Sequence, residues 1–332
     1  MKKNLLIYVE DPRFGGPHQY SLNIFDELKK NFNIKFIISN KENQIFLKKL
    51  KIKRANVQIL PLTFLSLKFD KVLSYFFFFI YEICLLRQNI KKDKIDIIYS
   101  ISGLYSFKVI LSTLFLNKKI VVHFHDAYCN IFFRCLSFFT KNFIDLSVYS
   151  SKKSFNFYSK YVGKNNYLIT PSSIKINGLK KKEKKNKKFF NIVTIANINP
   201  IKNLELLIMI AANIRYIKKI RFFIIGKVWK SQIGYYKNIK KLIKTYKLKN
   251  IFFNNFNNEK EIKKKLMSSD IYLCTSKNES SPMSIWEAMS CYLPVLSTNI
   301  GDLDIYNTKY NFGFIIKNET VDNFKNSILY LY

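Results

Sequence analysis

The chain has 332 residues, of which 48% are hydrophobic and 23% are charged, and this balance excludes an intrinsically disordered protein. Its formal net charge of +34 would attract anionic lipid or nucleic acid. Lys, Asn, Ile, Phe and Tyr are all abundant, which is typical of a protein encoded by an A/T-rich gene. That coding bias is another explanation for part of the lysine excess.

The first half of the chain alternates strand-like apolar runs with helical patterns. A strand at 5–9 leads into a loop that holds Gly15 and Gly16, and the spacing of Tyr20, Ile24 and Leu28 predicts a helix after it. Glycines at such a place let a ligand approach the backbone, although a tight turn would explain them equally well. Further strands are predicted at 34–38, 57–60, 95–100, 119–126, 146–151 and 167–170, and further helices at 41–50, 105–116 and 152–161.

An aromatic block at 72–81, continued by apolar residues to 87, predicts another helix in this half. The block is apolar nearly all round. Two interpretations follow: a helix packed in the core, or a helix whose outer face contacts a membrane or a partner.

All three histidines fall at predicted carboxyl ends of strands or in the loops that follow, where open α/β sheets bind ligands. They are His18, His123 and His125. Strand alternation puts His123 and His125 on one side, with Asp126 at the tip of the strand. A zinc site is the alternative for this group, but clear third and fourth ligands are lacking, so no metal is expected.

A lysine-rich segment at 175–188 has little apolar content and is the best domain boundary. It predicts a domain at 1–174 and a second at 189–332. A nucleic-acid-binding arm is the other interpretation of this segment, but nucleic acid is not the partner that we expect.

The second half restarts the alternation with a strand at 189–196 and a helix that passes through Leu204, Leu207, Ile208 and Ala211. Lys202 is predicted in the first turn of that helix, where the helix dipole disfavours a cation, so a nearby anion would explain it. One more surface lysine is the alternative. Later strands are predicted at 220–226, 251–253 and 271–274, and both halves therefore indicate an α/β protein with parallel sheets.

Two carboxylates, Glu279 and Glu287, stand with seven residues between them around a predicted helix start. Ser281 is a favourable N-cap, and Pro282 suits the first helical position. The N–H groups of such a start attract phosphate, and carboxylates accept hydrogen bonds from sugar hydroxyls, so a nucleotide sugar would satisfy both. Solvated surface acids are the alternative interpretation.

The segment 276–301 resembles the signature of the retaining glycosyltransferases of family 4, within glycosyl transferases group 1. Ser276 and Glu279 open the segment, and seven residues separate Glu279 from Glu287-Ala288-Met289. A turn, Pro294-Val295 and Gly301 follow. The resemblance implies the GT-B fold, two Rossmann-like domains facing across a cleft, with the donor mainly on the second. It implies catalytic roles for His125, Lys202 and Glu279, and nucleotide-sugar-binding roles for Gly15, Gly16, Asn197, Lys202, Glu279, Ser281, Pro282, Met283, Ser284 and Glu287.

The chain departs from the family pattern at several places. Asn197 stands where the family usually has Arg, and Val228 replaces a second glycine after Gly226. We also expect that the family's final helix, which crosses back to the first domain, is absent before Tyr332. These departures favour an alternative function, in which the chain is a catalytically impaired GT-B protein that acts as a membrane or polyanion-binding module.

The resemblance leads us to expect transfer of a hexose from a UDP- or GDP-type nucleotide diphosphate sugar, without a metal ion or other cofactor. The expected acceptor is a glycan or a lipid-linked glycan in cell-surface polysaccharide synthesis, such as that of lipopolysaccharide. A nucleotide-sugar epimerase is a third hypothesis, against which the Glu287-Ala288-Met289 segment argues. No charge-free apolar run reaches about 18 residues, so we expect no transmembrane helix. Five cysteines without a Cys-x-x-Cys pair predict a reducing, cytoplasmic location, and the basic surface predicts peripheral contact with the inner face of an anionic membrane.

Overall fold

The computed structural model describes residues 2–39, 44–64, 69–129, 131–164, 166–174, 188–256 and 258–332. These residues form two α/β units, Met1–Ser173 and Ile174–Tyr332, which are described separately. The predicted lysine-rich connection at 175–188 lies outside the described residues, except for Lys188.

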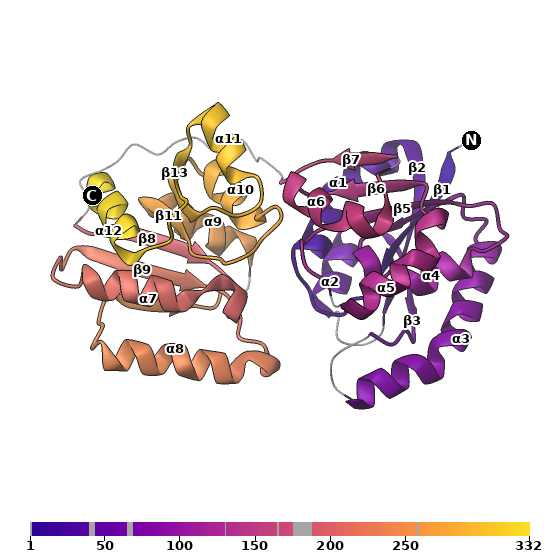
Figure 1. Ribbon diagram of the computed structural model, residues 1–332, viewed down its shortest axis with the longest axis horizontal. Helices are drawn as coiled ribbons and strands as arrows, with labels where there is room; N and C mark the ends of the chain where they lie inside the picture. The colour runs from indigo at the N-terminus through magenta and orange to yellow at the C-terminus, as the bar shows by residue number, and fades with distance from the viewer. Residues whose placement is uncertain are drawn as a thin grey trace. The chain divides into compact units, whose positions relative to one another are not determined.

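Unit 1 is built on a seven-stranded parallel sheet with the strand order β3-β2-β1-β4-β5-β6-β7 (Figure 1). The predicted elements of this half all occur, with ends shifted by a few residues. The strands are β1 (Lys3–Val9), β2 (Phe32–Ser39), β3 (Asn56–Leu60), β4 (Ile97–Ser100), β5 (Lys119–Phe124), β6 (Leu146–Tyr149) and β7 (Tyr167–Ile169). The helices are α1 (Gly16–Asn31), α2 (Gln44–Ile52), α3 (Phe69–Lys92), α4 (Phe107–Ser112), α5 (Ile131–Thr140) and α6 (Lys152–Val162).

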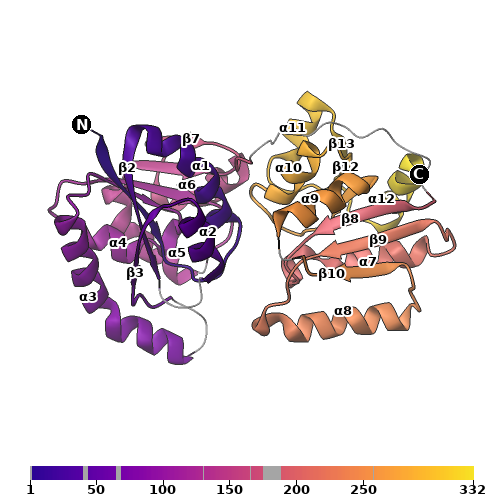
Figure 2. The ribbon, with the colours of Figure 1, turned by 180° about the vertical axis from the view of Figure 1, so that it is seen from behind.

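Strand β1 shows why helices cover both faces of this sheet, since its side chains alternate between two buried layers. Leu5, Ile7 and Val9 pack with residues of α1 and α2 on one face. Leu6 and Tyr8 pack with residues of α3 and α4 on the other. Figure 2 shows the sheet from behind.

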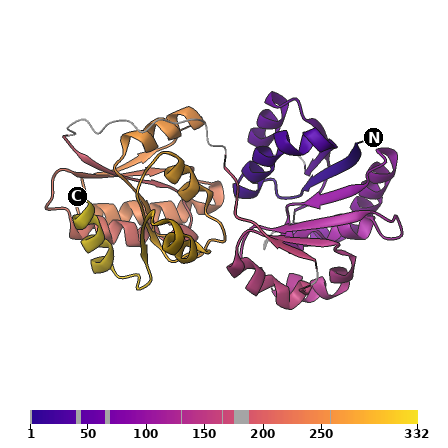
Figure 3. The same ribbon diagram turned by 90° about the horizontal axis from the view of Figure 1, so that it is seen from above.

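Unit 2 is a six-stranded parallel sheet with the order β10-β9-β8-β11-β12-β13. Its helices also lie on both faces, as the view from above shows (Figure 3). The strands are β8 (Phe190–Ile195), β9 (Ile220–Ile225), β10 (Ile251–Asn254), β11 (Ile271–Cys274), β12 (Val295–Thr298) and β13 (Gly313–Ile316). The helices are α7 (Leu204–Asn213), α8 (Ile233–Thr245), α9 (Glu259–Ser268), α10 (Met283–Ser290), α11 (Leu303–Tyr310) and α12 (Val321–Leu331).

Each face of the second sheet has a core of its own. Residues of α7, α8 and α12 pack on one face with Phe222 and Leu273. Residues of α9, α10 and α11 pack on the other with Tyr272 and Cys274. Strands β12 and β13 were not among the predicted elements, although they are as long as β10 and β11, which were predicted.

The α/β prediction with parallel sheets in both halves is confirmed. Within the part of the chain that the structure describes, no helix combines the length and the apolar character needed to cross a membrane.

Candidate functional site

The candidate site of unit 2 lies at the carboxyl ends of β8 and β11. These two strands are neighbours, and the chain winds outward from them in both directions, so they form the switch point of the sheet. Open α/β sheets bind ligands at such a point. Lys202 follows β8 in a 3₁₀ turn, Pro200–Lys202, and Glu279 lies in the loop after β11. The Lys202 Nζ atom is 2.7 Å from Glu279 Oε1, so the two predicted catalytic residues of this unit form an ion pair.

The position of Lys202 corrects one expectation. We predicted Lys202 in the first turn of the helix, but α7 begins only at Leu204. Asn199 caps the 3₁₀ turn by accepting a hydrogen bond from Lys202 N at 3.3 Å. Asn203, in a left-handed conformation with a φ of 46°, then separates this turn from α7.

Hydrogen bonds hold the two loops of the ion pair together. Ser276 Oγ donates to Glu279 Oε1 at 2.7 Å, and Thr275 Oγ1 donates to the carbonyl oxygen of Lys202 at 3.0 Å. The side chains of Lys202 and Glu279 are only 20% and 17% exposed. Burial alone would lower the pKa of Lys202, but the adjacent Glu279 carboxylate raises that pKa above its ordinary value, so Lys202 stays charged.

Helix α10 begins at Met283, and the prediction that Ser281 caps it is wrong. Pro282 occupies the cap position, one residue before the helix. The Ser281 hydroxyl instead accepts a hydrogen bond from Trp286 Nε1 at 3.1 Å. Met283 and Ser284 provide the first helical N–H groups, which have no carbonyl of an earlier helical turn to bond. Glu287 is half-buried about one turn further on.

Two glycines let the backbone of this site pack closely. A Cβ atom at Gly301 would lie 2.1 Å from the carbonyl oxygen of Ser280, and the φ of Gly301 is +56°. A Cβ atom at Gly226 would lie 1.8 Å from the carbonyl oxygen of Ala196, next to the exposed Asn197. Both glycines are therefore required by the shape of the loops around the ion pair.

The candidate site of unit 1 lies at the carboxyl edge of its own sheet. Gly15 precedes α1, and Gly16 is its first residue. The backbone of Gly15 is extended, and a Cβ atom there would meet nothing closer than 3.8 Å. The turn therefore does not require glycine at position 15, which favours the ligand-approach interpretation over the tight turn.

Two of the three histidines of unit 1 stack beside α1, the helix that follows this loop, and the third, His18, lies in α1 with its ring edge-on to Phe46. The rings of His123 and His125 are stacked with centroids 3.8 Å apart, so the expectation that they share one side is confirmed. Ser150 Oγ lies 3.0 Å from His123 Nε2 and 3.3 Å from His125 Nδ1. The Tyr20 ring of α1 packs edge-on against both. Asp126 points elsewhere, because its carboxylate accepts a hydrogen bond from Tyr158.

His125 is a neutral side chain with one unused ring nitrogen. Burial lowers its pKa to about 3, and burial also lowers the pKa of His123 well below the ordinary value. His125 Nε2 is buried and has no hydrogen-bond partner. A buried polar atom without a partner is costly, and a ligand hydroxyl would satisfy it.

A buried ionic group near the end of β1 was missed by the sequence analysis. Lys108 Nζ lies 3.2 Å from Glu10 Oε1 and 2.7 Å from Glu82 Oε2, and all three side chains are at most 1% exposed. Glu10 follows a strand directly, which was a usable signal. Lys108 and Glu82 lie in helical patterns, and nothing in those patterns distinguished them from charged residues on an exposed helix face.

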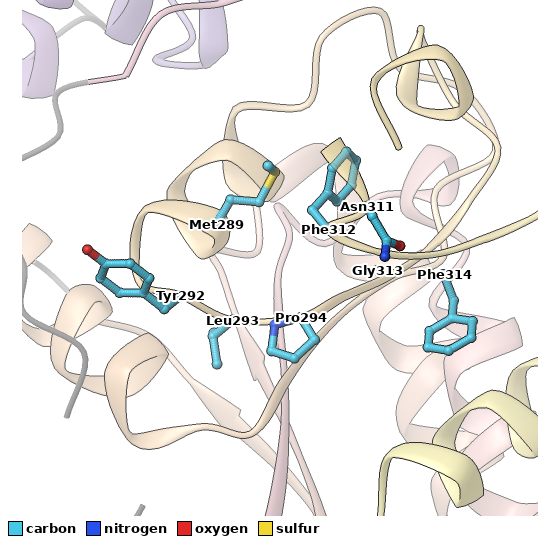
Figure 4. A pocket seen from close by; sticks show the side chains of 8 residues that line it. All are labelled: Met289, Tyr292, Leu293, Pro294, Asn311, Phe312, Gly313 and Phe314. Atoms are coloured by element: carbon cyan, nitrogen blue, oxygen red, sulfur yellow. The ribbon is translucent and has the colours of Figure 1, made fainter. Parts of the chain in front are cut away.

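A hollow of about 540 Å³ also occurs in unit 2, but at the opposite edge of the sheet (Figure 4). It lies at the amino ends of β12 and β13, away from Lys202 and Glu279, and is not the switch-point site. The hollow is lined by Met289, Tyr292, Leu293, Pro294, Asn311, Phe312, Gly313 and Phe314.

Among the described residues, no group of three or more His, Cys, Asp or Glu side chains could hold a metal ion.

Comparison with known proteins gives a family match for unit 2. Residues 176–332 match the family model for glycosyl transferases group 1. That match covers the unit with the Lys202–Glu279 pair. No protein among those with curated functions matches the chain by sequence.

Several solved structures share the fold over nearly the whole chain. HepE from Anabaena, in complex with UDP and glucose, superposes with a TM-score of 0.81 at 16% identity over 99% of this chain and 89% of that one. A glycosyltransferase from Rickettsia africae gives 0.78 at 17% identity, over 100% and 88%. A TarM mutant from S. aureus, in complex with Fondaparinux, alpha-GlcNAc-glycerol and UDP, gives 0.75 at 14% identity, over 100% and 92%. The chain therefore has the GT-B fold, as predicted.

Proposed function

We propose that this protein is a retaining glycosyltransferase of family 4 that moves a hexose from a nucleotide diphosphate sugar to a glycan or lipid-linked acceptor. One observation carries the proposal. The ion pair of Lys202 and Glu279 lies at the switch point of the unit that matches glycosyl transferases group 1. The HepE and TarM structures hold UDP, which makes a UDP sugar the first donor to test.

The proposed chemistry follows from where charge develops. Transfer breaks the bond between the sugar and the diphosphate, so the departing diphosphate gains negative charge. Lys202 and the N–H groups at the start of α10 would stabilise that charge, so the proposal uses no metal ion. Glu279 holds the Lys202 ammonium group by a hydrogen bond of 2.7 Å.

The remaining site residues would orient the donor. The carboxylates of Glu279 and Glu287 can accept hydrogen bonds from hexose and ribose hydroxyls, respectively. The neutral ring of His125 has an unused nitrogen that can exchange a hydrogen bond with a sugar hydroxyl. Gly15 and Gly16 would let the donor approach the backbone. We further propose cell-surface polysaccharide synthesis as the pathway, because the basic chain suits an acceptor on an anionic surface.

Donor binding tests the proposal directly. UDP, UDP-glucose and GDP are titrated by calorimetry into the wild type, Lys202→Met, Glu287→Ala and the control Lys237→Ala, which removes an exposed lysine of α8. We expect Lys202→Met to weaken UDP binding by about tenfold or more, because a charge-assisted contact to phosphate is lost. The control should bind as the wild type does.

Two results would contradict the proposal. Equal UDP affinity in the wild type and Glu287→Ala would refute the ribose role of Glu287. No binding of any nucleotide to the wild type would favour the alternative of a catalytically impaired GT-B protein. Asn197 is the observation behind that alternative, since its exposed amide supplies no charge where the family usually has an arginine.

A further inference from the structure

Helix α3 buries a charged residue on its inner face, beside the core residues Leu86 and Ile90. Its inner face buries Glu82, whose Oε2 atom is 2.7 Å from Lys108 Nζ, and Glu82 Oε1 accepts a hydrogen bond from Thr63 N at 2.7 Å. Lys108 also lies 3.8 Å above the centre of the Tyr75 ring. These contacts anchor α3 to the sheet and to α4 through buried charges.

The outer face of α3, in contrast, is apolar and exposed. Phe77 is 82% exposed and Ile80 is 68% exposed, whereas a surface helix normally turns such residues inward. Their spacing continues through the exposed Cys84, so they form one stripe along the helix. We call this surface the α3 stripe; it consists of Leu73, Phe76, Phe77, Ile80, Tyr81 and Cys84.

Lysines outnumber acids at the C-terminal end of the α3 stripe, where the half-buried Asp93 is ion-paired with Lys35. At its C-terminal end the helix exposes Lys91 and Lys92, and Lys94 follows in the next turn. Among the described side chains of α3, the acidic one is Glu82, and it is fully buried. The described side chains of α3 therefore present apolar groups and cations, and no exposed carboxylate, to an anionic surface.

A further exposed aromatic residue lies on a loop that is bonded to the helix. Arg87 Nη1 of α3 donates to the carbonyl oxygen of Leu114 at 2.6 Å, which ties α3 to the loop after α4. The next residue, Phe115, is 99% exposed and has a φ of 61°, a conformation that is rare for a bulky residue. Exposure of a large ring on a constrained loop is costly in water and favourable at a lipid interface.

We propose that the α3 stripe is a membrane-docking surface that binds anionic lipid bilayers, with α3 lying in the plane of the interface. The buried ionic anchor of the helix, the exposed apolar stripe and the flanking lysines together carry the proposal. The buried Glu82 and the absence of a spanning helix among the described residues exclude a transmembrane role for α3. This inference does not depend on the proposed transferase activity.

Vesicle co-sedimentation of the full chain tests the proposal. Vesicles contain phosphatidylcholine alone or with about 30% phosphatidylglycerol, at low salt and at about 0.5 M salt, where attraction between exposed charges is largely screened. The variants are Phe77→Glu and the charge-matched control Tyr216→Glu, which changes an exposed aromatic residue of unit 2. Both changes are at exposed positions, and equal thermal unfolding midpoints confirm that both variants fold.

We expect the wild type to bind the anionic vesicles and to keep part of that binding at high salt, because burial of the stripe does not depend on charge. Phe77→Glu should weaken binding by about tenfold or more, and Tyr216→Glu should leave it nearly unchanged. Lack of vesicle binding by the wild type would overturn the proposal, and so would equal loss in both variants. A concentration-dependent dimer that Phe77→Glu abolishes, measured by analytical ultracentrifugation, would assign the stripe to a second copy of the chain instead.

Discussion

At the scale of single residues, the candidate site of unit 2 retains a buried charge, and the candidate site of unit 1 suppresses one. Lys202 stays a cation because Glu279 is 2.7 Å away, although burial acts in the other direction. His125 stays neutral because burial lowers its pKa and no carboxylate raises that pKa again. The adjacent Asp126 carboxylate accepts a hydrogen bond from Tyr158 instead. The same physical term, desolvation, thus has opposite outcomes at two residues because their partners differ.

The neutral His125 makes stability depend on pH in a defined direction. Its pKa is about 3 in the folded protein, against an ordinary value of 6.5 in the unfolded chain. Between these values the unfolded chain binds a proton that the folded protein does not bind, so stability present above 6.5 is lost as the pH falls toward 3. His125→Asn should therefore reduce proton uptake on unfolding by up to about one proton.

Urea unfolding at about pH 7.5 and about pH 5.5 measures this effect, in a range where most carboxylates remain ionised. The loss of unfolding free energy between the two pH values should be smaller in His125→Asn than in the wild type. His18 and His123, whose pKa values are also lowered by burial, supply the dependence that remains. An identical loss in both proteins would show that His125 is not kept neutral by the fold.

At the scale of elements, the donor-side loops depend on close backbone approach as much as on side chains. The loop that holds Ser276 and Glu279 passes directly against Gly301, at the start of the segment that leads into α11. Thr298 Oγ1 at the end of β12 donates to the carbonyl oxygen of Ser276 at 2.6 Å. The loop after β11 is therefore positioned by β12 and its following turn.

Gly301→Ala should disturb this loop and lower stability. The added Cβ atom would lie 2.1 Å from Ser280 O, and the φ of +56° disfavours any residue with a Cβ atom. We expect a loss of about 1–3 kcal/mol in the free energy of unfolding, together with weaker UDP binding. Urea unfolding and calorimetry measure the two quantities.

Gly234→Ala in α8 is the matched control, because a Cβ atom there meets nothing within 4 Å and the φ is not positive. Helix propensity predicts an unchanged or slightly raised stability for it. If the two alanine variants behave alike, the packing of Gly301 against Ser280 does not constrain the site.

At the scale of the whole molecule, each unit has its own sheet and its own hydrophobic cores on both sheet faces. Both tryptophans of the chain, Trp229 and Trp286, belong to unit 2. Tryptophan fluorescence therefore reports the unfolding of the unit that carries the proposed donor site, whereas far-ultraviolet circular dichroism reports both units.

UDP should raise the midpoint of the tryptophan-detected thermal transition, because a ligand that binds only the folded unit stabilises it by mass action. At about 100 times its Kd the expected stabilisation is about 2.7 kcal/mol. The circular dichroism transition should broaden or split, since part of the helical signal comes from unit 1. An unchanged tryptophan transition at saturating UDP would argue against a donor site in unit 2.

Much of the fold was predictable from the sequence because α/β units leave periodic signals. Buried strands such as β1 and β11 appear as short apolar runs, and the spacing in α1 and α7 is helical. The segment around Glu279 and Glu287 was recognisable because its residue types and spacing are local in the chain. Local chemistry therefore determined the α/β class, the parallel sheets and the candidate residues.

Only the tertiary structure decided which residues meet. The pairing of Lys202 with Glu279 joins positions 77 residues apart and depends on β8 lying next to β11. The buried group of Glu10, Glu82 and Lys108 likewise combines β1, α3 and α4, and it leaves the aromatic stripe of α3 on the outside. Helical periodicity shows that a face is apolar, but whether that face is covered depends on what the rest of the chain packs against it.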